Sequence, residues 1–156
     1  MATPHRNGIL RSVSQSNVEL ARSALRAFEQ RDMNTIEELC APGIEFDWSR
    51  RLLDPTMTRG YDGIRQFLEE VDGIFHDIVF EEEEILEFGD EVLVVSTGRF
   101  RGRTSGVDVT AHGAIIWTIR DGKLVRFRFY QTKEDALEDL ASEGAQISAG
   151  PSAPAA

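Results

Sequence analysis

The sequence predicts a single α+β domain, in which helices cover one face of an antiparallel sheet. The length of 156 residues matches the usual size of one domain. Apolar residues recur at helical spacing in the first half of the chain and alternate in four consecutive segments of the second half. Turns such as Gly89-Asp90 and Asp121-Gly122 separate these segments, and consecutive hairpin strands pair antiparallel.

The first helix is expected to begin at Ser16. Ser16 and Glu19 form an S-x-x-E capping box, in which each side chain satisfies a backbone N–H near the helix start. Asp32 can cap a short second helix, which Pro42-Gly43 ends. The apolar stripe of the first helix consists of Val18, Ala21, Leu25 and Phe28.

The strands follow after one further loop and helix. Residues 44–49 alternate as a half-buried strand, residues 50–61 form a loop, and Asp62 can cap the third helix. Thr132 can cap a last helix, which extends through Leu140. The four consecutive strands are expected at residues 78–88, 91–103, 107–120 and 123–131.

Composition marks both ends of the chain as different from the domain. Residues 1–14 show no sustained periodicity and are expected to form a disordered head. Residues 143–156 are small, contain proline and are nearly uncharged, which is typical of a disordered tail. The folded domain is therefore expected to span residues 15–142.

Charge argues against several partner classes. The formal net charge is −10, so phosphate backbones and anionic lipid surfaces would repel the protein, and we expect neither nucleic-acid nor membrane binding. No stretch reaches the 18 apolar residues of a membrane helix. The first 15 residues lack the apolar segment of a signal peptide. These features favour a cytoplasmic protein.

Neither a metal nor a cofactor site is expected. The three histidines, His5, His76 and His112, are scattered along the chain, and a metal site needs clustered ligands. No G-x-G-x-x-G or P-loop pattern is present, so no nucleotide cofactor is expected. Cys40 is the one cysteine, which excludes an intrachain disulfide. On an apolar helix face it is expected to be a buried hydrophobe and no nucleophile.

Several stretches resemble the SnoaL-like branch of the NTF2-like superfamily. They are NVELARSALRAFEQRDMNTIEELCAPGIEFDW, RGYDGIRQFL, GRFRGRTSGVDV and IIWTIRDGKLVRFRFYQTKEDALEDL, between residues 16 and 141. The resemblance implies a cone, in which a curved antiparallel sheet wraps against three helices around an inner pocket. The family includes ketosteroid isomerases, epoxide hydrolases and polyketide cyclases, so the fold alone does not select a function.

Strand alternation predicts which side chains point into this cone. Arginines are poor lining for an apolar pocket, so the convex face receives Arg99, Arg101, Arg103, Arg126, Arg128 and Tyr130. The predicted pocket lining is Phe28, Phe46, Trp48, Phe67, Ser96, Phe100, Ile115, Trp117, Phe127, Phe129 and Gln131. Such a lining suits a hydrophobic or aromatic small molecule. Alternatively, these aromatic side chains simply fill the core.

The resemblance transfers no known catalytic set. It places the isomerase tyrosine at Ala24, the base at Trp48 with Asp47 adjacent, and the second acid near residues 113–115, and none of the three is retained. The epoxide hydrolases' Asp–Arg–Asp relay falls on residues 99–101, which include no acid. One hypothesis is therefore a small-molecule-binding protein without the family's proton-transfer residues.

The alternative is an isomerase, lyase or hydrolase of a hydrophobic carbonyl compound, with Asp47 as general base. Asp47 would act from the pocket mouth, or it is a solvent-facing carboxylate paired with Arg50 or Arg51. His112 is a second candidate because histidine titrates near neutrality. Its strand position, however, puts it on the convex face, where a homodimer interface is expected.

A run of four acids occupies residues 81–84. Two must face each side of a strand, so we expect an exposed strand that discourages edge pairing. Cross-strand pairs within the chain are expected with Arg99, Arg101 and Arg103.

Overall fold

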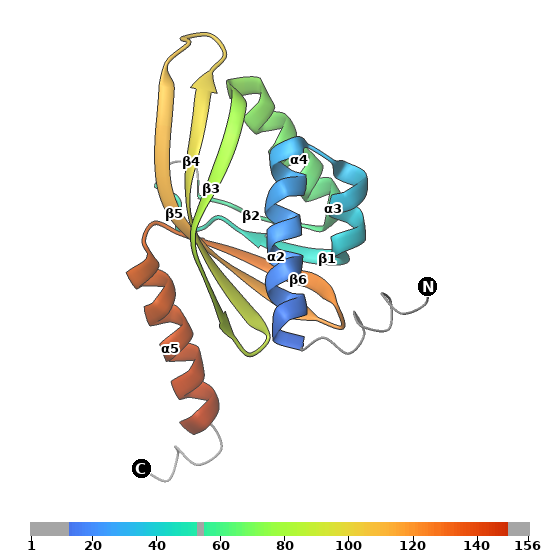
Figure 1. Ribbon diagram of the computed structural model, residues 1–156, viewed down its shortest axis with the longest axis vertical. Helices are drawn as coiled ribbons and strands as arrows, with labels where there is room; N and C mark the ends of the chain where they lie inside the picture. Colours follow the sequence, from blue (N-terminus) through green and yellow to red (C-terminus); the bar gives the residue numbers. More distant parts are fainter. Residues whose placement is uncertain (1–12, 53–54, 150–156) are drawn as a thin grey trace.

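A six-stranded, curved sheet forms the centre of the protein, as the computed structural model shows for residues 13–52 and 55–149 (Figure 1). Side chains are described for residues 17–52 and 55–144. The helices are α2 (Val13–Gln30), α3 (Met33–Leu39), α4 (Gly60–Ile74) and α5 (Lys133–Ala149). The strands are β1 (Cys40–Asp47), β2 (Met57–Arg59), β3 (Phe75–Phe88), β4 (Glu91–Gly102), β5 (Asp108–Arg120) and β6 (Lys123–Tyr130).

The sheet is mixed, which corrects the expectation of a purely antiparallel one. Its strand order is β2-β1-β6-β5-β4-β3. The four long strands form the predicted antiparallel meander, but β1 pairs with β6 in parallel, with Phe46 opposite Phe127. A hairpin turn determines only how the two strands that it joins pair. Because α4 separates β1 from the meander, no turn in the sequence indicates how β1 pairs. The three-residue strand β2 lies within the predicted loop and pairs with β1.

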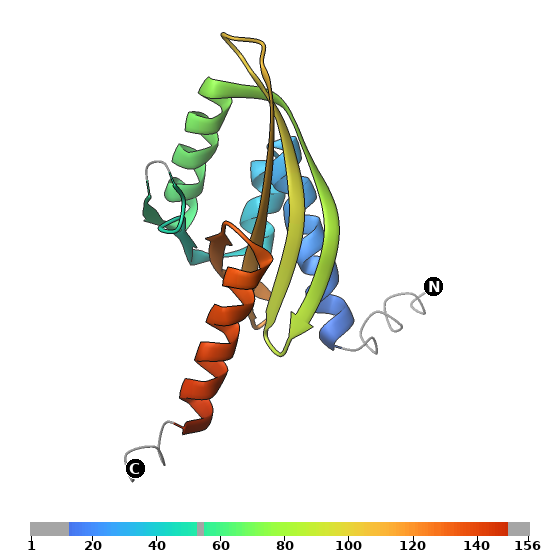
Figure 2. The same cartoon turned by 90° about the vertical axis from the view of Figure 1, so that its left-hand side faces the viewer.

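Helices lie on both faces of the sheet (Figures 1 and 2). A cluster of apolar side chains is buried on each face. On the concave face, α2, α3 and α4 pack against the sheet, as the cone fold requires. On the convex face, Ala136 of α5 packs against Leu93, Ala114 and Ile116. All three are buried, so α5 occupies part of the face to which the sequence assigns a dimer contact. A homodimer stays a prediction.

The helix ends differ from the sequence reading in three places. α2 begins at Val13, ahead of Ser16, and α5 continues to Ala149, into residues predicted to be disordered. Alanine-rich sequence without proline, as in residues 141–149, is compatible with a helix. Asp32 does cap α3, because its carboxylate accepts from Thr35 N at 3.2 Å. Asp62 instead lies in the first turn of α4, whose N-cap is Arg59.

Residues 1–12 and 150–156, which include most of the predicted head and half of the predicted tail, lie outside the described part of the chain. In the part that is described, no helix is long and apolar enough to span a membrane.

Candidate functional site

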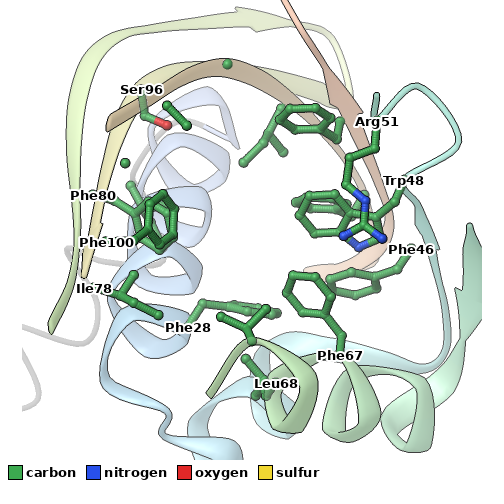
Figure 3. A pocket seen from close by; sticks show the side chains of 18 of the residues that line it. Phe28, Phe46, Trp48, Arg51, Phe67, Leu68, Ile78, Phe80, Ser96 and Phe100 are labelled. Atoms are coloured by element: carbon green, nitrogen blue, oxygen red, sulfur yellow. The ribbon is translucent and has the colours of Figure 1, made fainter. Parts of the chain in front are cut away.

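A cavity of about 250 Å³ lies between the concave face of the sheet and helices α2 and α4 (Figure 3). This volume is slightly below the usual range for ligand pockets, which is roughly 300–1,000 Å³. Its wall is mainly aromatic and aliphatic. The apolar lining consists of Leu25, Phe28, Phe46, Trp48, Phe67, Leu68, Val71, Phe75, Ile78, Phe80, Phe100, Ala111, Ile115, Trp117, Phe127 and Phe129.

Ten of the eleven residues that the sequence assigns to the pocket line this cavity, and Gln131 does not. For the β4 and β5 residues among them, Ser96, Phe100, Ile115 and Trp117, alternation predicts the direction because the β4–β5 ladder has no register shift. β6 ends at Tyr130, so alternation no longer applies to Gln131. The Gln131 side chain instead donates from Nε2 to the Arg50 carbonyl oxygen at 3.1 Å.

The aromatic rings form one continuous wall of the cavity. The Trp48 ring stacks on Phe67 with 4.6 Å between centroids, and Phe46 stacks on Phe127 at 4.8 Å. Trp117 packs edge-on against Phe127 at 5.0 Å. These rings therefore fill the core on one side, as the simpler interpretation expects, and leave a cavity on the other.

Small residues of β4 and β5 create the open space. A Cβ added at Gly98 would lie 2.8 Å from the Phe100 ring, and one at Gly113 would lie 2.8 Å from the Phe129 ring. Both glycines let those rings pack flat against the sheet. Ser96, next to them in the sheet, extends its hydroxyl into the cavity (Figure 3).

Four polar residues complete the lining: Arg31, Arg51, Ser96 and His112. Sequence reasoning missed the two arginines. Arg31 continues the three-residue spacing of Leu25 and Phe28, so the spacing was a usable signal. Arg51 follows β1 in a segment without periodicity, where no pattern predicts direction. Its guanidinium lies over the Trp48 ring, 5.3 Å from the centroid, and extends into the cavity (Figure 3).

Both tryptophans of the chain line the cavity, and each has a buried indole N–H. Neither Trp48 Nε1 nor Trp117 Nε1 has a hydrogen-bond partner among the described residues. A buried donor without a partner costs about 1–3 kcal/mol. A ligand oxygen within reach of either N–H would remove that cost.

The sequence model of the SnoaL-like domain matches residues 21–127, more than half of the chain. The chain belongs to the SnoaL-like domain family. The curved sheet of this SnoaL-like domain, with helices on its concave face, matches the cone that the resemblance implies, so the fold prediction is confirmed. No curated protein sequence matches the chain.

Solved structures similar to this SnoaL-like protein carry different functional names. TerC, co-crystallised with polyporic acid, is 25% identical, with a TM-score of 0.67 over 79% of this chain and 96% of that one. A putative SnoaL-like polyketide cyclase from Jannaschia sp. CCS1 is 19% identical, with a TM-score of 0.68 over 82% and 93%. An epoxide hydrolase like LEH from M. tuberculosis is 14% identical, with a TM-score of 0.64 over 88% and 98%. The last two show the fold alone.

Asp47, the proposed base of the enzyme hypothesis, does not line the cavity of this SnoaL-like domain. It is buried, and its carboxylate accepts from Ser49 N at 2.9 Å and Ser49 Oγ at 2.5 Å and pairs with Arg50 at 3.3 Å. Burial acts to raise the pKa of the Asp47 carboxyl, but the Ser49 hydrogen bonds and the Arg50 charge outweigh it and lower the pKa. A carboxylate held in this way is a weak base.

His112 lines the cavity, but its ring makes its hydrogen bond on the convex face. His112 Nδ1 lies 2.9 Å from Thr97 Oγ1, which donates to Glu83 at 2.5 Å. Thr97 alternates with the inward Ser96 and pairs with His112 across β4 and β5. His76 contacts Asp77, with 3.1 Å between Nδ1 and the carboxylate, and His5 lies outside the described residues.

Cys40 is buried as expected, although it is the first residue of β1 and not part of a helix face. Burial raises the pKa of its thiol to about 12, so the thiolate is scarce at neutral pH. Within residues 17–52 and 55–144, no group of three His, Cys, Asp or Glu side chains could hold a metal ion.

The acidic run at residues 81–84 forms pairs on both sides of β3. Glu81 pairs with Arg99 at 3.1 Å, which is the expected cross-strand pair. The remaining three acids have other partners: Glu82 pairs with Arg22 of α2, Glu83 accepts from Thr97, and Glu84 pairs with Lys133 of α5. Arg101 pairs with Asp108 instead, and the Arg103 side chain donates to a backbone carbonyl. Ion pairs of this acidic run therefore link β3 to α2 on one face of the sheet and to α5 on the other.

Proposed function

We propose that this SnoaL-like protein binds a small hydrophobic or aromatic molecule in the cavity. The observation that carries the proposal is an aromatic wall with open space before it and two buried indole N–H groups that have no hydrogen-bond partner among the described residues. Apolar lining supplies most of the binding free energy of a small ligand, and a few polar groups orient it.

The similarity to TerC supports a small organic ligand. TerC was co-crystallised with polyporic acid and shares 25% of its residues with this chain over most of both lengths. The alternative, an isomerase- or cyclase-like reaction with Asp47 as general base, has less support. The Asp47 carboxylate bonds to Ser49 and Arg50 outside the cavity, and among the described lining residues there is no Asp, Glu or Tyr.

Calorimetric titration with a neutral ring compound, 2-naphthamide, tests binding. Ser96→Leu places an apolar side chain in the open space, so it should weaken binding at least about tenfold while the variant stays folded. Thr110→Leu is the matched control, because Thr110 is an exposed residue of β5 that does not line the cavity.

Tryptophan emission provides a second readout, because both tryptophans of the chain lie on the cavity wall. The emission of the wild-type protein and the control should change with the same midpoint as the calorimetric signal. Binding that Ser96→Leu leaves unaltered would place the ligand elsewhere and refute the proposal.

A further inference from the structure

We infer that the ligand of the cavity is a ring compound with a carbonyl or similar acceptor oxygen, which accepts a hydrogen bond from the Ser96 hydroxyl. The inference rests on the proposed function and narrows it to one class of ligand. It gives Ser96 the role of the residue that orients the ligand and distinguishes it from a hydrocarbon of the same shape.

The Ser96 hydroxyl is a buried polar group that no other described residue satisfies. Ser96 is 7% exposed, and it forms no hydrogen bond with another described side chain. Its neighbour Thr97, by contrast, uses its hydroxyl to bind Glu83 and His112 on the convex face. Figure 3 shows the Ser96 hydroxyl directed into the cavity. Since burying an unpaired hydroxyl costs free energy, a molecule that enters the cavity and pairs with it recovers that free energy on binding.

The surroundings of Ser96 on the sheet are apolar. Gly113 lies directly opposite Ser96 in the β4–β5 ladder, and Gly98 follows two residues along β4. The rings of Phe129 and Phe100 lie against these two glycines. The Ser96 hydroxyl therefore lies next to apolar rings, where a hydrogen bond is stronger than in water.

The aromatic wall faces Ser96 across the cavity. Figure 3 shows Trp48 on the side opposite Ser96, and the Trp48 ring stacks on Phe67 with 4.6 Å between centroids. A flat ring packed on this wall would lie across the open space. An oxygen on the far rim of such a ring would be directed toward the Ser96 hydroxyl.

The polar groups of the cavity favour an acceptor over a donor on the ligand. Trp48 Nε1 and Trp117 Nε1 can only donate, and neither has a partner among the described residues. The described lining includes no Asp, Glu, Asn or Gln side chain that could accept from a ligand donor. The Ser96 hydroxyl can donate to a carbonyl oxygen without any further partner.

Two probes of the same shape test the inference: 2-acetylnaphthalene has a carbonyl oxygen where 2-isopropenylnaphthalene has a CH₂ group. Equilibrium dialysis suits both, because they are uncharged and sparingly soluble. Ser96→Ala removes only the hydroxyl, so it should weaken the binding of the ketone about 3- to 10-fold, the usual net contribution of one hydrogen bond. The affinity for the alkene should change less than about twofold.

The carbonyl stretching band provides a readout that a change in packing alone would not reproduce. A hydrogen bond to the carbonyl oxygen lowers this frequency, so isotope-labelled ketone should absorb at a lower frequency in the wild-type protein than in Ser96→Ala. Ser96→Cys, whose thiol is a weak donor, should give an intermediate frequency and affinity, and it serves as a second variant.

Thr110→Val is the matched control. It also removes one hydroxyl, but Thr110 is an exposed residue of β5 that does not line the cavity. Both affinities and the carbonyl frequency should equal those of the wild type.

The possible failures can be told apart. If the wild-type protein binds neither probe nor 2-naphthamide, the proposed function itself fails. If the probes bind but Ser96→Ala weakens both equally, the inference is overturned and the proposed function stands. A ketone affinity and a carbonyl frequency that survive both Ser96→Ala and Ser96→Cys would overturn it in the same way.

Discussion

Replacing Arg128 with Met should destabilise the protein by about 3 kcal/mol. The side chain of Arg128 is 1% exposed and pairs with Glu91 of β4 and with Asp139 and Glu143 of α5, the last two at 3.4 and 2.6 Å. Burial acts to lower the pKa of Arg128, but the acids beside it outweigh burial and raise the pKa, so the guanidinium stays charged. It joins α5 to the convex face.

The magnitude follows from what the substitution leaves behind. Removing one partner of a buried ion pair costs about 3–5 kcal/mol, because the other charge remains desolvated. The three acids are 22%, 30% and 34% exposed, so water reaches them and the cost should fall at the lower end. Methionine occupies much of the space of the arginine stem, which limits any added cavity cost.

Urea unfolding measures the loss in the free energy of unfolding. Amide hydrogen exchange should show that the backbone amides of α5 lose protection before those of the sheet. Arg126→Met is the matched control on the same strand and face. Arg126 is 38% exposed, and its partner Glu45 also pairs with Arg59, so the change should stay within about 1 kcal/mol. A loss below about 1 kcal/mol for Arg128→Met, or one equal to that of Arg126→Met, would refute the reasoning.

Two further predictions concern Asp47 and Cys40. Because the folded-state pKa of Asp47 is lowered, its contribution to stability is present at neutral pH and is lost as the pH falls through that pKa. Asp47→Asn should therefore cost about 1–3 kcal/mol at pH 7 in urea unfolding, with a smaller difference near pH 3, and a difference independent of pH would contradict this. The Cys40 thiol, with a pKa of about 12, should react with a disulfide reagent at least about 100-fold more slowly in the folded protein than in urea. Rapid labelling of the folded protein would show that Cys40 is accessible.

Sequence patterns predict the parts of this fold that depend on regular alternation. The bounds of β4 and β5 and the inward direction of Ser96, Ile115 and Trp117 follow from period two, because the two strands pair without a bulge. The parallel pairing of β1 with β6 could not be obtained in this way. It depends on where α4 carries the chain, and not on a local turn.

Strand alternation predicts which face of the sheet a side chain lies on, but it does not predict whether that side chain is buried or which charges it pairs with. Arg128 and Tyr130 face the convex side as predicted, but both are buried. Arg51 was missed for a related reason: it lies in an irregular segment after β1, where no period applies. Asp47 follows Phe46 and so faces away from the cavity, but only the structure shows its bonds to Ser49 and Arg50.

A crystal structure of the protein with 2-naphthamide tests the central claim, that the cavity binds a small ring compound, most directly. The account predicts a ring bound in the cavity against Trp48. A cavity closed by its own aromatic side chains, with the probe absent or bound elsewhere on the surface, would contradict the account.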